Sequence, residues 1–267
     1  MRDLMMERLG DLRHEPTEKW LRGSLDGVDV VDSTGALLVW EPRRIVPSYA
    51  VPVSDIAGTL TPVPSLPAPD APVLTPGNPF AAHSTPGQAY DVVVGDRTLP
   101  GAAFTPQTLE GYVVLDFRAF DRWREEADEQ VGHPRDPYHR VDMRPSDRRV
   151  QISRDGVLLA DSTRPTLVFE TSLMTRFYLP REDVLADLQP TATKTTCAYK
   201  GHASYYAVNG VADLAWTYLA PVPDAQQLTG LVAFYDERVD VVVDGVVRGR
   251  PSGPIAEAIR TEFGLDQ

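Results

Sequence analysis

Short stretches of alternating apolar and polar side chains recur along the chain, with turn residues between them. This two-residue period is typical of β-strands that bury one face. In the C-terminal half it predicts strands at 149–153, 157–160, 166–170, 176–179, 203–208, 214–219, 231–235 and 239–243.

Turn residues between these stretches indicate how the strands connect. Asp155-Gly156 separates the first two strands, and Asp-Gly supplies the positive φ angles of a type I′ hairpin turn. Asn209-Gly210 and Asp244-Gly245 predict further turns. Strands joined by tight turns form antiparallel sheets. We therefore expect a mainly β fold (β-rich α+β), with sheets bent into an open barrel or sandwich.

A few short helices are also expected. An apolar side formed by Phe117, Phe120 and Trp123 favours a helix over 115–130. The other predicted helices lie at 3–13, 180–188 and 254–263.

The pattern of the N-terminal half returns in the C-terminal half. Asp155-Gly156 follows Asp26-Gly27 at the same spacing at which Asp161-Ser162 follows Asp32-Ser33. The same spacing separates Glu170 from Glu41 and Tyr178 from Tyr49. Such internal similarity predicts a tandem duplication. The expected parts are an extension (1–18), a first repeat (19–130), a second repeat (131–250) and a C-terminal helix (251–267). We expect the two repeats to pack against each other, with the proline-rich path from Pro62 to Pro86 lying on the partner repeat.

The composition of the chain argues against some classes of binding partner. The chain has 267 residues and a formal net charge of -12. This charge repels phosphate backbones and anionic membranes, so we expect no nucleic-acid partner and no membrane partner. No run approaches the ~20 apolar residues of a membrane helix. The single cysteine, Cys197, excludes an intramolecular disulfide and favours a reducing, cytoplasmic location.

The most reactive side chains lie close together at Cys197 and Lys200. A thiolate beside a cation has a lowered pKa and acts as a nucleophile, base or ligand, whereas a free cysteine is also a common buried apolar residue. Glu170 follows an apolar strand, which predicts a buried carboxylate paired with Arg176 or Lys200. It is either a general base or part of a structural ion pair.

Metal and phosphate motifs are absent from the sequence. No His-x-x-x-His pair occurs, and His83 is expected in an exposed loop. Asp236, Asp240 and Asp244 are candidates for a divalent ion, but a solvated strand face explains them better. We predict no metal site, and the cofactor is unknown.

The second repeat resembles the family called domain of unknown function 427, which is labelled in places a putative nucleotidyltransferase family. The resemblance covers about His133 to Gly245 and rests on these segments: Asp161-Ser162, Glu170-Thr171, Tyr178 to Val184, Thr196 to Gly201, Ala215 to Tyr218, Pro221 and Ala233 to Tyr235. The family pattern Cys-Pro-Tyr-Lys-Gly has Ala198 in place of proline here. The resemblance implies no settled activity.

The first repeat lacks the reactive pair. Aligning the repeats places Asn78 opposite Cys197 and Ala81 opposite Lys200. We therefore expect the first repeat to be catalytically silent and to support the second one.

These observations lead to one hypothesis and one alternative. The hypothesis is a small-molecule site in the second repeat, possibly that of an enzyme, with Cys197, Lys200 and Glu170 as catalytic residues. The substrate-binding residues would be Arg176, Tyr178, Tyr199 and His202. The alternative is a non-catalytic binding or interaction scaffold in which Cys197 is buried and structural.

Overall fold

Two units, Met1–Asp136 and Pro137–Gln267, make up the chain in the computed structural model. The structure describes residues 7–250, 257–258, 260–261 and 264. We call the two parts the first unit and the second unit, and each is described by itself. Almost all their secondary structure is antiparallel β-sheet with a few 3₁₀ turns, as the sequence predicted.

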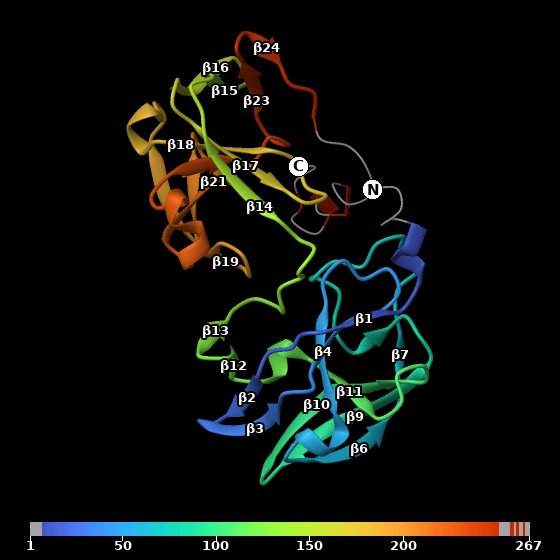
Figure 1. Cartoon of the computed structure of the whole chain (residues 1–267). Coiled ribbons are helices and arrows are strands. Elements are labelled where there is room, and N and C mark those ends of the chain that lie inside the picture. The colour runs from blue at the N-terminus through green and yellow to red at the C-terminus, as the bar shows by residue number, and fades with distance from the viewer. Residues whose placement is uncertain (1–6, 251–256, 259, 262–263, 265–267) are drawn as a thin grey trace. The chain divides into compact units, whose positions relative to one another are not determined.

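The first unit contains two main sheets (Figure 1). Its strands are β1 (Arg13–Pro16), β2 (Leu21–Leu25), β3 (Val28–Ser33), β4 (Leu37–Trp40), β5 (Ser48–Pro52), β6 (Thr59–Val63), β7 (Leu66–Pro67), β8 (Ala82–His83), β9 (Gly87–Val94), β10 (Arg97–Pro106), β11 (Tyr112–Leu115), β12 (Arg122–Glu125) and β13 (Asp128–Gln130). Its 3₁₀ turns are η1 (Arg8–Gly10), η2 (Val53–Asp55) and η3 (Phe117–Ala119). The larger sheet has the order β1-β4-β5-β11-β10-β9-β6, and the smaller one β13-β12-β2-β3.

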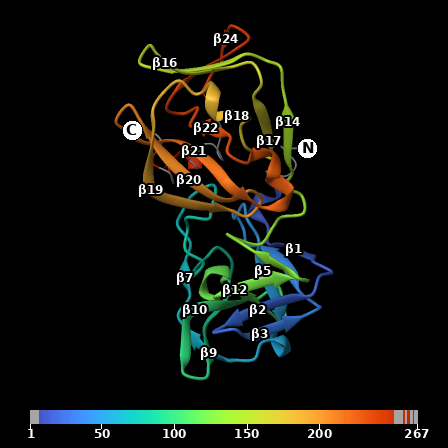
Figure 2. The same cartoon turned by 90° about the vertical axis from the view of Figure 1, so that its left-hand side faces the viewer.

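The second unit also contains two sheets, and Figure 2 shows β19, β20 and β21 side by side in the larger one. Its strands are β14 (Val141–Pro145), β15 (Val150–Arg154), β16 (Val157–Ser162), β17 (Thr166–Glu170), β18 (Arg176–Leu179), β19 (Leu188–Cys197), β20 (Gly201–Val208), β21 (Val211–Pro221), β22 (Val232–Phe234), β23 (Asp240–Val243) and β24 (Val246–Val247). Its 3₁₀ turns are η4 (Arg181–Asp183) and η5 (Pro223–Leu228). The orders are β14-β17-β18-β22-β21-β20-β19 and β16-β15-β23-β24.

The strands of the two units pair in the same order once β7 and β8 are set aside. In each unit, apolar side chains from both sheets form one core cluster, as in a two-layer sandwich. Inside the second unit this core includes Ile152 from the smaller sheet and Phe177 from the larger one. The tandem duplication itself, with its repeat limits, stays a prediction.

One residue match between the repeats is wrong. Leu38 pairs with Tyr49, whereas Leu167, the counterpart of Leu38, pairs with Phe177. Tyr49 therefore corresponds to Phe177, and Tyr178 lies one position further along its strand. A slip of one residue moves a side chain to the opposite face of a sheet. Accordingly, Tyr49 belongs to the core between the sheets, and Tyr178 belongs to a cluster outside it.

The helix expected over 115–130 is also wrong. That stretch ends β11, makes the turn η3 and continues as β12 and β13. Trp123 is buried on β12, and its ring packs against Tyr49 with centroids 5.2 Å apart. The aromatic residues meet in the core through this turn and strand, so their helix-like spacing in the sequence was misleading.

The other predicted helices are shorter than expected or only partly described. In the 3–13 stretch, the described residues contain η1, and Arg13 already begins β1. Only 181–183 of the expected 180–188 helix is helical, as η4. Most of the expected helix at 254–263 lies outside the described residues.

The proline-rich path lies on the sheet of its own unit. Phe80 packs against a cluster that includes Val39 and Ala50, and the Arg44 guanidinium donates to the carbonyl oxygens of Pro79 and Ala82 at 2.9 and 2.7 Å. This path was expected on the partner repeat. The apolar face of its own sheet provides a surface for it.

Candidate functional site

Glu170 is the centre of a buried polar cluster in the second unit. The Lys200 ammonium donates a hydrogen bond to Glu170 Oε2, and His139 Nε2 lies 3.0 Å from Glu170 Oε1. The side chains of Glu170 and Lys200 are 8% and 10% exposed, and that of His139 is 20% exposed. We call these three residues the Glu170 cluster. Both carboxylate oxygens of Glu170 are engaged.

Local chain geometry brings Lys200 to Glu170. Glu170 ends β17, opposite Val141 of β14, while Lys200 lies in the tight turn between β19 and β20. Gly201 closes this turn with a φ angle of +97°, which L side chains rarely adopt. A Cβ atom at Gly201 would also lie 3.2 Å from the Val222 nitrogen. The turn that places the Lys200 ammonium beside Glu170 therefore requires glycine at position 201.

Burial and ion pairing shift the pKa values of Glu170 and Lys200 in opposite directions. Burial raises the pKa of Glu170, but the Lys200 charge and the His139 hydrogen bond outweigh it and lower the pKa to about 2. Burial likewise lowers the pKa of Lys200, and the charge of Glu170 outweighs it, so that pKa is raised. Both groups therefore stay charged near neutral pH, where such a carboxylate is a weak proton acceptor.

Cys197 occupies the same turn. It is a free, half-buried cysteine, and its backbone carbonyl accepts a hydrogen bond from the Lys200 amide at 3.3 Å. A thiolate at Cys197 would add to the raised pKa of Lys200. Of the three residues predicted to be catalytic, Cys197 is the candidate nucleophile, and the roles of all three stay predictions.

The predicted tyrosines have different surroundings. Tyr178 is buried, and its hydroxyl accepts a hydrogen bond from Trp216 Nε1 at 3.1 Å. Burial raises the pKa of Tyr178 to about 12, so it stays protonated near neutral pH. Tyr199 is half-buried and stacks on His139, with ring centroids 4.5 Å apart. Tyr199 thus contacts the Glu170 cluster through His139.

Arg176 and His202 have other partners. The Arg176 guanidinium makes an ion pair with Glu237 at 2.7 Å and another with Asp236 at 3.3 Å. His202 is exposed, and its Nδ1 lies 2.9 Å from Thr196 Oγ1. The sequence allowed either Arg176 or Lys200 as the ion-pair partner of Glu170, and the partner in the structure is Lys200.

The aspartates considered for a divalent ion are dispersed. Asp236 pairs with Arg176, Asp240 is exposed on β23, and Asp244 pairs with Arg148 at 2.6 Å. Within the described part of the chain, no three His, Cys, Asp or Glu side chains are grouped so that they could hold a metal ion. In the same part, no helix is long and apolar enough to cross a membrane.

Residues 142–245 match the family model NTP_transf_9, described as "Domain of unknown function (DUF427)". This match lies within the second unit, and we refer to the matched range as the DUF427 domain. No curated protein matches the chain. The matched range includes Glu170 and the turn from Cys197 to Gly201, whereas His139 lies three positions before it.

Sequence reasoning missed His139 as a member of the site. No local motif marks it. Its contact with Glu170 spans 31 positions and depends on how the chain enters β14. Pairing of β14 with β17 is the feature that brings it there.

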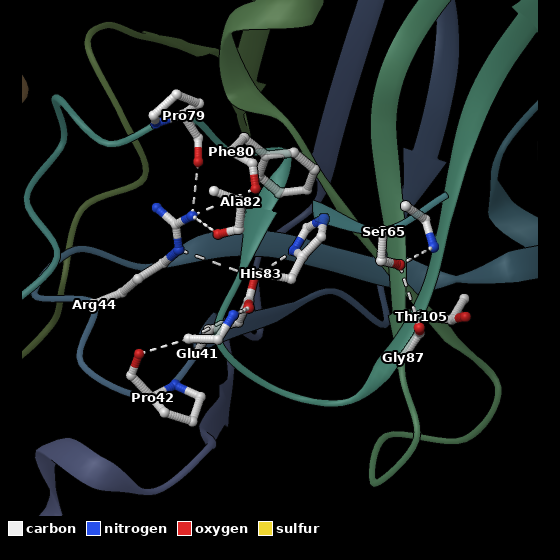
Figure 3. A network of polar contacts seen from close by, with 12 residues as sticks. Glu41, Pro42, Arg44, Ser65, Pro79, Phe80, Ala82, His83, Gly87 and Thr105 are labelled. Carbon is white, nitrogen blue, oxygen red and sulfur yellow. Dashed lines mark hydrogen bonds and ion pairs between the residues drawn. The ribbon is translucent and has the colours of Figure 1, made fainter. Parts of the chain in front are cut away.

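The first unit has a comparable buried contact outside the DUF427 domain (Figure 3). His83 Nδ1 lies 3.0 Å from Glu41 Oε1, and the Ser84 amide donates to Glu41 Oε2 at 2.8 Å. The His83 ring stacks on Phe104 with centroids 3.6 Å apart. With a side chain only 2% exposed, His83 does not lie in the exposed loop predicted for it. The partners of Glu41 thus include His83, two positions after the Ala81 that the alignment placed opposite Lys200, and Arg44, whose Nε lies 4.0 Å from Glu41 Oε1.

Proposed function

We propose that the DUF427 domain binds a small molecule and that an oxygen atom of this ligand accepts a hydrogen bond from Lys200. The observation that carries the proposal is the incomplete hydrogen bonding of a buried ammonium. An ammonium has three N–H donors. Among the described residues, Glu170 is the hydrogen-bond acceptor found for Lys200 Nζ. Buried donors usually have partners, and a ligand oxygen would supply one.

Charge balance indicates the class of ligand. Glu170 already neutralises Lys200, so the ligand need not carry a full compensating charge. A carbonyl, carboxylate or phosphate oxygen meets the need, because each accepts hydrogen bonds from an ammonium. Tyr199 and the thiol of Cys197 lie in the same turn and would line the approach.

Enzymatic activity is the more specific form of this proposal. The thiol of Cys197 would lose its proton to solvent, and the thiolate would add to a carbonyl carbon of the ligand. The C–S bond forms as the C=O π bond breaks, and Lys200 would stabilise the negative charge that this electron pair places on the oxygen. In this form Glu170 holds the ammonium in position. The short name of the family model points to nucleotides, so ATP belongs among the probes.

Protection of Cys197 from alkylation tests ligand binding. The protein would be treated with iodoacetamide in the presence of acetate, pyruvate, inorganic phosphate, AMP or ATP with Mg²⁺, and alkylation followed by intact mass. We expect at least one probe to slow alkylation in the wild type and to lose this effect in Lys200→Met. Lys194→Met is the matched control, because Lys194 is exposed and lies outside the Glu170 cluster. Equal alkylation rates with every probe would count against the proposal.

A structural scaffold is the second candidate. What favours it is the first unit, where Glu41 makes a comparable buried contact without a cysteine–lysine pair beside it. On this view Glu170 and Lys200 fasten the turn between β19 and β20 to the sheet. Loss of stability in Lys200→Met, with no protection by any probe in the wild type, is the outcome that this candidate predicts.

A further inference from the structure

Tyr218 on β21 has a buried hydroxyl without a hydrogen-bond partner. The residue is 4% exposed, and no partner for its hydroxyl is found among the described residues. The neighbouring Tyr178, whose ring centroid lies 6.4 Å away, accepts a hydrogen bond from Trp216. Buried polar groups usually have partners, so the unpartnered hydroxyl of Tyr218 points to a group that binds there.

Solvent reaches the Tyr218 hydroxyl in the structure as it stands. Thr217 Oγ1, on the same strand, is sealed from solvent and has no partner in the described part of the chain. The Tyr218 hydroxyl is not sealed in this way, although the rest of its side chain is buried. Contact with this oxygen therefore requires no rearrangement of the strands.

Tyr218 shares a face of the larger sheet with Cys197. Residues that pair across antiparallel strands point to the same face, and so do residues two apart on one strand. Tyr218 pairs with Ala203, Ala203 pairs with Thr195, and Cys197 follows Thr195 by two positions. Burial raises the pKa of Tyr218, and a negative charge on Cys197 would raise it further. The hydroxyl therefore stays protonated near neutral pH and is a hydrogen-bond donor on the side of the sheet that carries the thiol.

The first unit has no hydroxyl at the matching position. Strand pairing makes Pro106 of β10 the counterpart of Tyr218. In the first unit the proline-rich path lies over this face, and its His83 stacks on Phe104, two positions before Pro106. The corresponding connection in the second unit, between β19 and β20, is the tight turn that contains Lys200. A donor thus replaces proline in the unit that also carries the cysteine–lysine pair.

We propose that Tyr218 is a ligand-binding residue of the site around Cys197 and Lys200, and that the ligand is a neutral carbonyl compound. The Tyr218 hydroxyl and the Lys200 ammonium each donate a hydrogen bond to the carbonyl oxygen, whose two lone pairs accept both. This inference rests on the proposed function of the same site and names the class of its ligand.

Charge favours a carbonyl group over an anion. Lys200 and Glu170 already neutralise each other, so a carboxylate or phosphate would bring an uncompensated negative charge into a buried site. A neutral carbonyl brings no charge until Cys197 adds to it. The thiol then gives its proton to solvent, the C–S bond forms as the C=O π bond breaks, and the electron pair moves to the oxygen. Lys200 and Tyr218 stabilise that oxygen until it takes a proton from solvent.

Propanal is a suitable probe, because its reversible addition to Cys197 blocks alkylation by iodoacetamide. Intact mass follows the alkylation. In the wild type we expect propanal to protect Cys197 at a lower concentration than it protects N-acetylcysteine, and acetate and inorganic phosphate to protect less well. Tyr218→Phe keeps the ring and should raise the half-protecting concentration of propanal about five- to tenfold, the scale of one hydrogen bond. Tyr206→Phe is the matched control, because Tyr206 packs against the core on the other face of the sheet.

Urea denaturation separates a binding role of the hydroxyl from a structural one. Because the Tyr218 hydroxyl has no partner, Tyr218→Phe should not lower the midpoint of unfolding. Tyr178→Phe removes the acceptor of the Trp216 hydrogen bond and should lower it. A midpoint for Tyr218→Phe as low as that of Tyr178→Phe would assign the hydroxyl a structural role and overturn the proposal.

The protection data distinguish this inference from the proposed function. Equal protection by propanal in the wild type and in Tyr218→Phe overturns the role of Tyr218 but leaves the proposed function standing. Stronger protection by acetate or phosphate than by propanal overturns the neutral carbonyl as the ligand class. An equal loss of protection in Tyr206→Phe overturns the role of Tyr218, because the effect would not be specific. No protection by any probe in the wild type contradicts the proposed function and this inference with it.

Discussion

Glu170 is a buried carboxylate whose charged form is retained because its partners outweigh the cost of burial. Lys200 and His139 engage its two oxygens separately. Removing one partner of a buried ion pair leaves the other charge uncompensated, which usually costs more than the pair itself contributes. The stability of the second unit should therefore depend strongly on this residue.

Glu170→Gln tests this dependence. The substitution keeps the shape and a hydrogen-bond acceptor but removes the charge that compensates Lys200. We expect the free energy of unfolding to fall by about 3–5 kcal/mol, measured by urea denaturation near neutral pH. Glu182→Gln is the matched control: Glu182 pairs with Arg164 at 2.8 Å, but both side chains are exposed, so the change should be below about 1 kcal/mol. Equal effects of the two substitutions would contradict the assigned burial of Glu170.

Acid should remove the same stabilisation. The pKa of Glu170 is about 2 in the folded protein, and its usual value is 4.5. A lowered folded-state pKa gives stability that is fully present above pH 4.5 and is lost as the pH falls through about 2. The contribution is about 3 kcal/mol. The stability difference between wild type and Glu170→Gln, followed by urea denaturation from about pH 6 to pH 3, should shrink as the pH falls. A constant difference would contradict the lowered pKa.

At the scale of elements, local turn chemistry was predicted well. Asp155 and Gly156 have φ angles of 51° and 77°, and the hairpin between β15 and β16 forms where Asp-Gly predicted it. Turns of this kind depend on two adjacent residues. The Trp123 segment failed because its strand pairs with β2, which lies about one hundred positions earlier. Such a pairing leaves no local signal.

Gly87 shows how closely strands β9 and β10 approach each other in the first unit. A Cβ atom there would lie 2.4 Å from Phe104 Cζ and 2.4 Å from the Thr105 carbonyl oxygen. Gly87→Ala should therefore displace Phe104, on which His83 stacks, and lower the free energy of unfolding by about 1–3 kcal/mol. Gly249→Ala is the control, because nothing lies within 4 Å of a Cβ atom there. Thermal unfolding of both variants is the measurement, and equal melting temperatures would contradict this fit.

At the scale of the whole molecule, the sequence predicted the fold class and one contact of the candidate site. The contact between Lys200 and Glu170 was one of two pairings that the sequence allowed, because both charged residues are adjacent to apolar strands. The roles of His139 and His83 were not predictable, since each reaches its glutamate across more than thirty positions. Strand order decides such contacts, and residue spacing does not encode it.

The second unit should fold without the first unit. The second unit contains both of its sheets and the core between them, formed by residues from Val150 to Val243. A chain that starts at Pro137 keeps every one of these strands. Because its core is complete, we expect residues 137–267 to be soluble when expressed alone and to unfold cooperatively. Glu170→Gln should lower its stability by about as much as in the full chain, since the Glu170 cluster lies wholly within this unit.

Thermal unfolding of the fragment and of the full chain also tests the predicted packing of the two repeats. If the first unit supports the second, the fragment will melt cooperatively but at a lower temperature than the same strands do in the full chain. Equal melting temperatures would show that the first unit adds nothing to the stability of the second, and the support role would be wrong. A fragment without a cooperative transition would instead contradict the self-sufficient core. The fragment that carries Glu170→Gln is the internal control. If the substitution lowers the melting temperature of the fragment and of the full chain by the same amount, the isolated unit keeps its native ion pair.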